Sequence, residues 1–399
     1  MKFISQSSLG LATFGAALSF TAASLAGSAG PVFYGDAPDE HHPWAVHDGN
    51  RPQPKLVTPG TFSSPEQPGK PPSDAIVLFD GTDLSKWESP KDNGSAPQWT
   101  IVDGNVLRVK PGSGDIRTKE KFGDCQLHIE WAAPTEVKES SQGRGNSGLF
   151  LMGRIEIQVL DSYNNITYAD GHAASVYGVC PPMANAVRPP GQFQVYDIVF
   201  RRPLYKDGKV VDPGYVTVFV NGVLAQDHTM IEGGTGHMGR SKIGSLGEKG
   251  SLQLQDHGNF MRFRNIWYRE LPPRITEGGT DGYLSIEATL AKRHEIATSV
   301  RQDAEKMTNP QAQMYRLLES LIYEKDDATY AKAEQITTQY MADLKQLPAD
   351  KLTPKKDEVK HFSDVCKYLA KFKIVPADFA PRVAADQMIK DQGWDKKKP

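Results

Sequence analysis

The sequence is poor in cysteine, nearly balanced in charge and short of long apolar runs. A formal net charge of -2 over 399 residues provides no basic surface to attract nucleic acid. After the N-terminal segment, no stretch is apolar over the ~20 residues that a membrane-spanning helix needs. The sequence therefore predicts no nucleic-acid partner and no stable membrane insertion once the N-terminal segment has been removed.

Cysteine occurs only three times, as Cys125, Cys180 and Cys366. An oxidising compartment would permit one disulfide, and Cys125 with Cys180 is the favoured pair because both lie in the strand-rich part of the chain. Three buried free thiols are the alternative. No Cys-x-x-Cys motif and no Cys/His ligand spacing is present, which argues against a structural zinc site.

The N-terminus has the pattern of an export signal. Lys2 supplies a short positive start, and the stretch from Leu9 to Leu25 is apolar, small and uncharged. Small residues at 24–26 and 27–29 offer cleavage sites. A membrane anchor is the alternative, but the apolar run is short and rich in Ala, Gly and Ser. We expect residues 1–29 to be a cleaved signal peptide and the mature protein to be periplasmic or secreted.

Residues 30–73 have the composition of a Pro-rich linker. Ten of the 28 prolines lie at 31–72, where aliphatic residues are few. Such a segment cannot bury a core of its own, so we expect it to be mobile or extended on the surface. Three histidines lie within it, His41, His42 and His47, and a solvated tract explains them more simply than a metal site.

Short runs of β-forming residues dominate residues 74–272. The stretches "VDGNVLRV" and "FVNGVLA" carry an Asp-Gly and an Asn-Gly turn between apolar runs, which is typical of hairpins. Many short strands without an intervening helical pattern predict a mainly β fold, an antiparallel sandwich or a jelly roll.

The period of the apolar pattern changes after about residue 284. Two stretches recur at helical spacing: Met314, Leu317, Leu318, Leu321 and Ile322, and then Phe362, Val365, Cys366 and Leu369. This spacing predicts amphipathic helices with charged outer faces. We expect residues 284–390 to form an α-helical C-terminal region.

Two of the predicted strands pair an apolar face with a face of amides, carboxylates or imidazole. The stretch 154–161 alternates Ile and Val with Glu156 and Gln158, and the stretch 251–258 alternates Leu with polar residues that end at His257. Such rows suit sugar hydroxyls, which both donate and accept hydrogen bonds. The solvent-facing side of an ordinary antiparallel sheet is the alternative.

Six motifs in order resemble the 3-keto-disaccharide hydrolase domain family. They are "LFDGTDLSKW" (78–87), "NSGLFLMG" (146–153), "EIQVLD" (156–161), "ASVYGVCPP" (174–182), "VFVNG" (218–222) and "LQDHGNFMRFRNIWYREL" (254–271). The resemblance spans about residues 76–271 and leaves the Pro-rich and helical parts uncovered. It implies a concanavalin A-like jelly roll that cleaves glycosides already oxidised at C3. Family members usually show Trp-Asn where this chain has Phe193-Gln194, which bears on substrate preference.

The resemblance also implies the location of the site. Glu156 and His257 would be catalytic, or would together hold a divalent metal ion. The implied substrate-binding residues are Asn146, Ser147, Gln158, Asp161, Tyr177 and Gln255.

The chemistry of a C3 ketone is consistent with such a set. The ketone acidifies the C2 proton, so a base can form an enolate, the C1 substituent can leave by elimination, and water can add back. This route needs one base and does not need the opposed carboxylate pair of ordinary glycosidases. We therefore expect an exported hydrolase or lyase acting on an oligosaccharide or glycoside.

Two other functions fit the same sequence. One is a non-catalytic carbohydrate-binding jelly-roll module, and the other is an envelope scaffold whose helical tail binds a partner protein. A buried pair of Glu156 and His257 in one cleft would favour the enzyme. A shallow aromatic groove would favour the module, and a wide apolar stripe on the tail helices would favour the scaffold.

Overall fold

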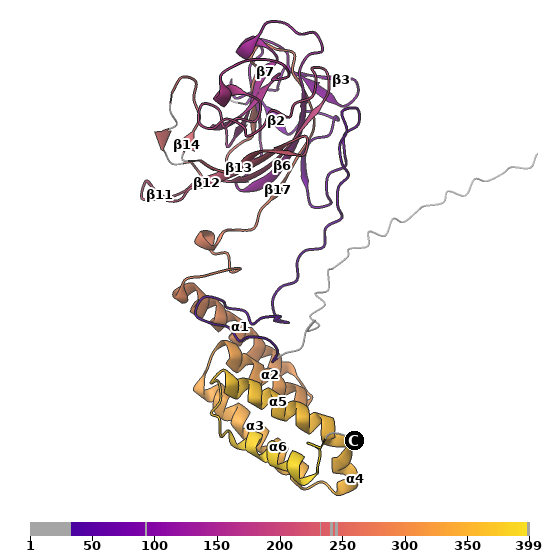
Figure 1. Cartoon of the computed structure of the whole chain (residues 1–399), viewed down its shortest axis with the longest axis vertical. Coiled ribbons are helices and arrows are strands. Elements are labelled where there is room, and N and C mark those ends of the chain that lie inside the picture. The colour runs from indigo at the N-terminus through magenta and orange to yellow at the C-terminus, as the bar shows by residue number, and fades with distance from the viewer. Residues whose placement is uncertain (1–32, 92–93, 232, 240–241, 244–245, 397–399) are drawn as a thin grey trace, which may run out of the picture. The chain divides into compact units, whose positions relative to one another are not determined.

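The computed structural model describes residues 33–91, 94–231, 233–239, 242–243 and 246–396. The predicted signal peptide at 1–29 lies outside these residues. The described chain forms two compact units (Figure 1): a helical unit, made of the residues up to Gln53 together with those from Thr280 onward, and a jelly-roll unit, Pro54–Gly279. The jelly-roll unit is therefore inserted between the two parts of the helical unit.

The jelly-roll unit contains two large antiparallel sheets. The eight-stranded sheet consists of β1 (Ile76–Phe79), β3 (Thr100–Val102), β4 (Val106–Arg108), β6 (Cys125–Ala132), β9 (Gln194–Arg201), β12 (Gly214–Val220), β13 (Val223–Ile231) and β17 (Arg262–Glu270). The five-stranded sheet consists of β2 (Trp87–Glu88), β5 (Ile116–Thr118), β7 (Asn146–Leu151), β8 (Ile155–Leu160) and β16 (Gln253–Leu254). Two small pairs join β10 (Leu204–Lys206) to β11 (Lys209–Asp212) and β14 (Gly233–Gly234) to β15 (Lys242–Ile243).

The strand order of the eight-stranded sheet is β13-β12-β9-β6-β17-β4-β3, with β1 also paired to β17, and that of the five-stranded sheet is β2-β5-β16-β7-β8. One apolar core lies between the sheets and contains Ile129 and Tyr196 from the first and Ile157 and Leu254 from the second, each 0% exposed. The predicted antiparallel jelly roll is confirmed.

Both predicted hairpin turns are present. Asp103 and Gly104 join β3 to β4 with φ values of 51° and 78°, and Asn221 and Gly222 join β12 to β13 with φ values of 52° and 83°. The Asn221-Gly222 connection is a two-residue hairpin, which requires positive φ at both residues, whereas the β3–β4 loop has three residues, 103–105. Asp-Gly and Asn-Gly reach positive φ with little strain.

The helical region predicted after residue 284 is also confirmed. It comprises α1 (Ile286–Lys306), α2 (Pro310–Tyr323), α3 (Asp327–Lys345), α4 (Ala349–Leu352), α5 (Lys356–Lys371) and α6 (Ala380–Asp391). Short 3-10 turns occur at Ser141–Gly143, Ala169–Gly171, Ile275–Glu277 and Thr353–Lys355. Ser285, Asn309 and Asp326 cap α1, α2 and α3 by accepting a backbone N–H of the first turn. Among the described residues, no helix is long and apolar enough to cross a membrane.

Residues 33–53 pack on the helices of the helical unit, of which they form a part. Asn50 Nδ2 donates to Glu319 Oε1 (2.5 Å) and to Tyr323 Oη (2.8 Å), and Tyr323 Oη donates to Asp48 (2.8 Å). Trp44 packs on the apolar core of the helices. Residues 33–53 form no helix or strand, and specific contacts dock them on the helices.

A second part of the same segment, which we call the 58–73 loop, folds onto the jelly-roll unit. Its two arms pair through Thr61 N–H and the Lys70 carbonyl (3.0 Å), and Ser63 Oγ donates to Glu130 Oε1 of β6 (2.7 Å). Arg264 of β17 donates to backbone carbonyls of the loop. The expectation that the segment is mobile or extended on the surface stays a prediction. Composition did not reveal the specific partners that distant helices and strands supply to residues 33–53 and 58–73.

Removal of the buried cation under the 58–73 loop should destabilise the jelly-roll unit. Arg264 and Glu130 are 3% and 0% exposed and lie 2.7 Å apart, so Arg264→Met leaves a buried carboxylate without its charge partner. We expect a loss of about 3–5 kcal/mol in the free energy of unfolding, measured by urea denaturation. As a control, Glu270→Ala breaks an exposed ion pair with Lys249 and should change the free energy of unfolding by less than about 0.5 kcal/mol. Equal stability of the two variants would contradict the prediction.

Docking of residues 33–53 can be tested by limited proteolysis. The double variant Asp48→Ala/Asn50→Ala removes the hydrogen bonds to α2, so chymotrypsin should cleave after Trp44 several-fold faster than in the parent. Leu56 is 97% exposed and serves as an internal control that should be cut equally in both proteins. An unchanged cleavage rate after Trp44 would show that these contacts do not hold the segment.

Candidate active site

One row of side chains crosses all five strands of the five-stranded sheet. Ladder pairs join Glu88 to Arg117, Arg117 to Gln253, Gln253 to Phe150, and Phe150 to Glu156. Directly paired residues of antiparallel strands have their side chains on the same face of the sheet. The row therefore lies on the face away from the core, and Glu156 is its last member, on β8.

The carboxyl group of Glu156 is largely buried from solvent. Its residue is 8% exposed, and burial and, next, the negative charge of Asp115 raise the pKa of Glu156 to about 7. A Cβ atom at Gly148 would lie 2.5 Å from Glu156 Oε1, so only glycine at this position leaves enough space for the carboxylate. A carboxyl group with a pKa near 7 can both take and give a proton at neutral pH.

Asp115 is held beside the same row. It accepts hydrogen bonds from Gln253 Nε2 (2.8 Å) and from the Asp256 N–H (2.9 Å). Two residues further on, Arg117 forms an ion pair with Glu88 at 2.8 Å. Sequence reasoning missed Asp115 and Arg117 because β5 has three residues and shows no period.

A second cluster lies along the outer edge of β8, the edge that faces away from β7. Val176 forms a bridge with Ile157, and the Tyr177 N–H donates to the Glu156 carbonyl oxygen at 3.1 Å. Tyr177 Oη lies 2.6 Å from Tyr168 Oη and 2.9 Å from His237 Nδ1. Burial raises the pKa of Tyr177, so it remains a neutral hydroxyl group at physiological pH.

Tyr168 and His237 are functional candidates that the sequence did not reveal. Both lie outside the strands of the two large sheets, so no strand period marks them. Tyr177, in contrast, was predicted from the family motif; its backbone N–H bonds to the Glu156 carbonyl oxygen, and its role in binding substrate stays a prediction.

Gln142 connects two of the predicted substrate-binding residues. Its Oε1 accepts from Gln158 Nε2 at 3.0 Å and from Asn146 Nδ2 at 3.3 Å, and its Nε2 donates to Thr167 and Gly171. Gln158 is 1% exposed and Asn146 is 3% exposed. These amides hold the loops next to β7 and β8 in place, which is a positioning role for the site.

Ser147 and Asp161, also predicted to bind substrate, are buried and bonded within the protein. Ser147 Oγ donates to the Gln255 carbonyl oxygen (2.7 Å), and Asp161 accepts from Arg144 Nε (2.7 Å). Gln255 is half-buried, and its N–H donates to the Gly148 carbonyl oxygen (3.0 Å), which extends the contact between β16 and β7. Of these three, Gln255 keeps its side chain free for a ligand within the described residues.

His257 lies beyond the strand pairing. β16 ends at Leu254, and His257 is exposed in the loop that follows, where its ring makes no hydrogen bond or ion pair with any described residue. Its pairing with Glu156, as an acid–base couple or as metal ligands, stays a prediction. Across the described part of the chain, no group of three or more His, Cys, Asp or Glu residues is arranged to hold a metal ion.

Comparisons with known proteins assign the jelly-roll unit to a family. The 3-keto-alpha-glucoside-1,2-lyase-like domain family matches residues 74–269. A candidate glycosyl hydrolase of known structure from Parabacteroides distasonis ATCC 8503 is 47% identical, covering 55% of this chain and 93% of that chain with a TM-score of 0.52. The chain belongs to this family.

Two further solved structures have lower identity. A second candidate glycosyl hydrolase from Parabacteroides distasonis ATCC 8503 is 21% identical over 50% of this chain and 94% of that chain, with a TM-score of 0.35. The beta-glucanase of Bacillus licheniformis is 11% identical over 50% of this chain and 99% of that chain, with a TM-score of 0.29. None of the curated proteins matches the chain.

The departure from the family pattern at Phe193-Gln194 has a structural explanation. Gln194 is 2% exposed, and its Oε1 accepts from the Arg188 N–H (2.7 Å) and from Asn221 Nδ2 (2.8 Å). The guanidinium of Arg264 lies 3.8 Å from the centre of the Phe193 ring. Both residues therefore support loops and side chains of the eight-stranded sheet, and neither belongs to the Glu156 row.

The three cysteines all lie in the described part of the chain and are free, so the favoured Cys125–Cys180 disulfide is not formed. Cys125 and Cys366 are buried, and burial raises the pKa of each thiol, to about 12 for Cys366. Such thiols remain protonated and unreactive at neutral pH.

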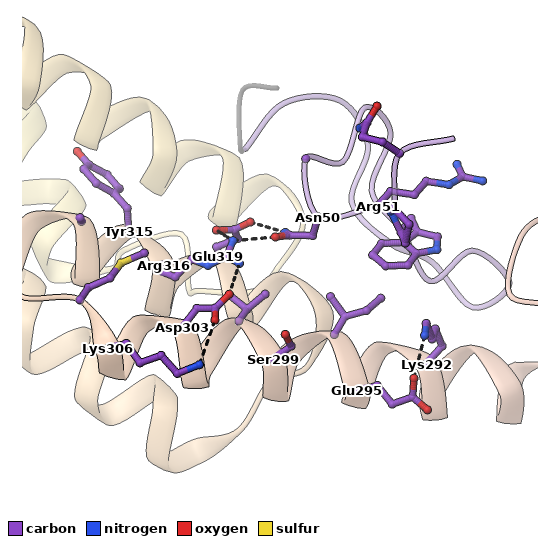
Figure 2. A pocket seen from close by; sticks show the side chains of 18 residues that line it. Asn50, Arg51, Lys292, Glu295, Ser299, Asp303, Lys306, Tyr315, Arg316 and Glu319 are labelled. Carbon is purple, nitrogen blue, oxygen red and sulfur yellow. Dashed lines mark hydrogen bonds and ion pairs between the residues drawn. The ribbon is translucent and has the colours of Figure 1, made fainter. Parts of the chain in front are cut away.

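The helical unit has a hollow of its own, about 930 Å³ in volume, between α1, α2 and residues 44–53 (Figure 2). Its charged side chains are paired with one another: Arg316 with Asp303 (3.1 Å) and Glu319 (2.7 Å), and Lys292 with Glu295 (2.9 Å). These charges compensate one another, whereas Glu156 of the jelly-roll unit has no cationic partner among the described residues.

The high pKa of Glu156 should be visible in the pH dependence of stability. Its folded-state pKa of about 7 lies above the ordinary value of 4.5, so its favourable contribution is complete below pH 4.5 and is lost as the pH rises through 7. Glu156→Gln removes this loss, and at pH 8 it should raise the free energy of unfolding by about 1–3 kcal/mol relative to the parent.

The matching control is Glu136→Gln, because the Glu136 side chain is 77% exposed. The difference in the free energy of unfolding between Glu136→Gln and the parent should not change with pH. A difference between Glu156→Gln and the parent that is the same at pH 4.5 and pH 8 would contradict the assignment of a high pKa.

Proposed function

We propose that the jelly-roll unit cleaves glycosides oxidised at C3, by elimination across C1 and C2 followed by hydration. The observation that carries the proposal is Glu156, a buried carboxyl group with a pKa of about 7 on the outward face of the five-stranded sheet. The family assignment supports the same reaction class. A non-catalytic binding module would have no need of a buried acid tuned in this way.

Glu156 serves as the base in this proposal. Near neutral pH about half of it is ionised, and the carboxylate removes the C2 proton, whose acidity comes from the neighbouring ketone. The electron pair forms an enolate, the C1–O bond breaks, and the departing oxygen takes a proton. Water then adds across the new double bond, and the carboxylic acid can return its proton in that step.

Tyr177 is the proposed hydrogen-bond donor to the developing charge. Its hydroxyl remains neutral because burial raises its pKa, and Tyr168 and His237 hold it in position. A divalent cation held by Glu156 and His257 would supply the same stabilisation by polarising the C3 carbonyl. The two routes differ in their response to a chelator.

We further propose that the enzyme acts outside the cytoplasm, in the periplasm or after secretion. The support is the pattern at residues 1–29, with its short positive start, apolar run and small-residue cleavage sites.

Turnover of a 3-keto-glucoside by the purified chain tests the proposal. Glu156→Gln keeps the shape of the side chain but removes the base, so kcat/KM should fall about a hundredfold or more. Gly148→Ala keeps the carboxylate but displaces it, and we expect a fall of about tenfold. Gly247→Ala, in an exposed loop, should leave the rate unchanged.

The pH profile adds a readout that misfolding would not imitate. With Glu156 as the base, kcat/KM of the parent should rise with pH and level off above about 7. Addition of EDTA and the variant His257→Ala test the metal route. Binding of the ketoglycoside without turnover would indicate the binding module, and full activity in a well-folded Glu156→Gln variant would exclude Glu156 as the base.

A further inference from the structure

We propose a second carbohydrate-binding site on the outward face of the eight-stranded sheet, away from the sheet that carries Glu156. A cavity of about 470 Å³ lies there, between the central strands and the 58–73 loop. The residues of the sheet that line it include Gln126 and His128 of β6, Asp197 of β9, and Asn265 and Trp267 of β17. A cavity of this volume falls within the range of small-molecule sites.

A β-bulge brings two of these side chains to the cavity together. Arg264 pairs with Glu130 and Trp267 pairs with His128, so β17 has one more residue than β6 between the two pairs. The extra residue is at Asn265, whose φ of 49° is unusual for a residue with a side chain. Bulges of this kind re-aim side chains, and here Asn265 and Trp267 both line the cavity.

His128 holds Asp197 at the cavity wall. Its Nδ1 lies 2.7 Å from Asp197 Oδ1, and its ring stacks on Trp267 with a centroid separation of 4.9 Å and an interplanar angle of 6°. His128 is buried, whereas the Asp197 side chain is 44% exposed and engages only Oδ1 among the described residues. The second carboxylate oxygen is thus free for a ligand in a fixed geometry.

Glu130 supports the site from below. It is wholly buried and accepts hydrogen bonds from Arg264 Nε, Asn265 Nδ2 and Ser63 Oγ, each at 2.7 Å. These bonds fix both Asn265 and the 58–73 loop, so the cavity is bordered on both sides by groups whose positions are set.

The lining suits a polyhydroxylated ligand. It combines the carboxylate of Asp197, the amides of Gln126 and Asn265 and the cations of Arg188 and Lys70, so it offers both hydrogen-bond acceptors and donors. Phe62 of the 58–73 loop is fully exposed and lines the same cavity. A flat apolar ring beside amides and a carboxylate suits a sugar, which has an apolar C–H face and a rim of hydroxyl groups.

Binding of neutral disaccharides to the full chain tests this site. Cellobiose and maltose are the probes, glucuronic acid is the anionic comparison, and the readouts are calorimetry and saturation-transfer NMR. We expect one of the disaccharides to bind and Asp197→Ala to weaken it about tenfold or more, since hydrogen bonds to a charged group contribute that much. Phe62→Ala should weaken binding several-fold, and its exposure means that folding is not at risk.

Two control variants separate this site from the Glu156 site. Asp227→Ala removes another exposed carboxylate of the same sheet and should leave binding unchanged, as should Glu156→Gln. If Asp197→Ala does not fold, Asp197→Asn replaces it, because this variant removes the charge and keeps the size of the side chain. The proposal is overturned if neither disaccharide binds, if glucuronic acid binds more tightly than both, or if Glu156→Gln abolishes binding while Asp197→Ala and Phe62→Ala retain it.

Discussion

The register between β7 and β8 is the constraint on which the candidate active site depends. Phe150 pairs with Glu156 and Gly148 pairs with Gln158, so the carboxylate lies on the outward face while Ile155 and Ile157 enter the core. A shift by one residue would exchange the two faces. Segments around Val176 and Thr235 bond to the backbone of β8 along its outer edge, and Glu156 is 8% exposed, so it is neither well solvated nor part of the core.

Two buried carboxylates, one on each sheet, show how surroundings separate reactive from structural groups. Burial raises the pKa of Glu156, and the nearby negative charge of Asp115 raises it further. Burial acts in the same direction on Glu130, but hydrogen bonds from His128, Ser63 and Asn265 and the charge of Arg264 outweigh it and hold the pKa of Glu130 below its usual value. Glu130 therefore remains an anion that fastens loops, whereas Glu156 can exchange a proton at neutral pH.

Periodicity predicted an antiparallel β region followed by helices and placed Glu156 on a polar strand face, and the family resemblance supplied the jelly roll. Periodicity could not show that Glu156 is buried, since the segments that bond to β8 come from loops without a period. Asp115 lies just before β5, a strand too short to be recognised, and His237 lies in a loop. The partners of Gln158 and Asn146 were likewise hidden, because Gln142, which engages both, lies in a 3-10 turn whose path is set by tertiary contacts.

The insertion of the jelly-roll unit into the helical unit has a consequence for the order of folding during synthesis. The residues up to Gln53 leave the ribosome first, but the helices against which they pack are made last. Closing that contact around an unstructured intervening chain carries a loop entropy that grows with the length of the loop. A jelly roll that has already folded removes most of this disorder, so vectorial synthesis favours completion of the inserted unit before Asn50 and Trp44 find α2 and the helical core.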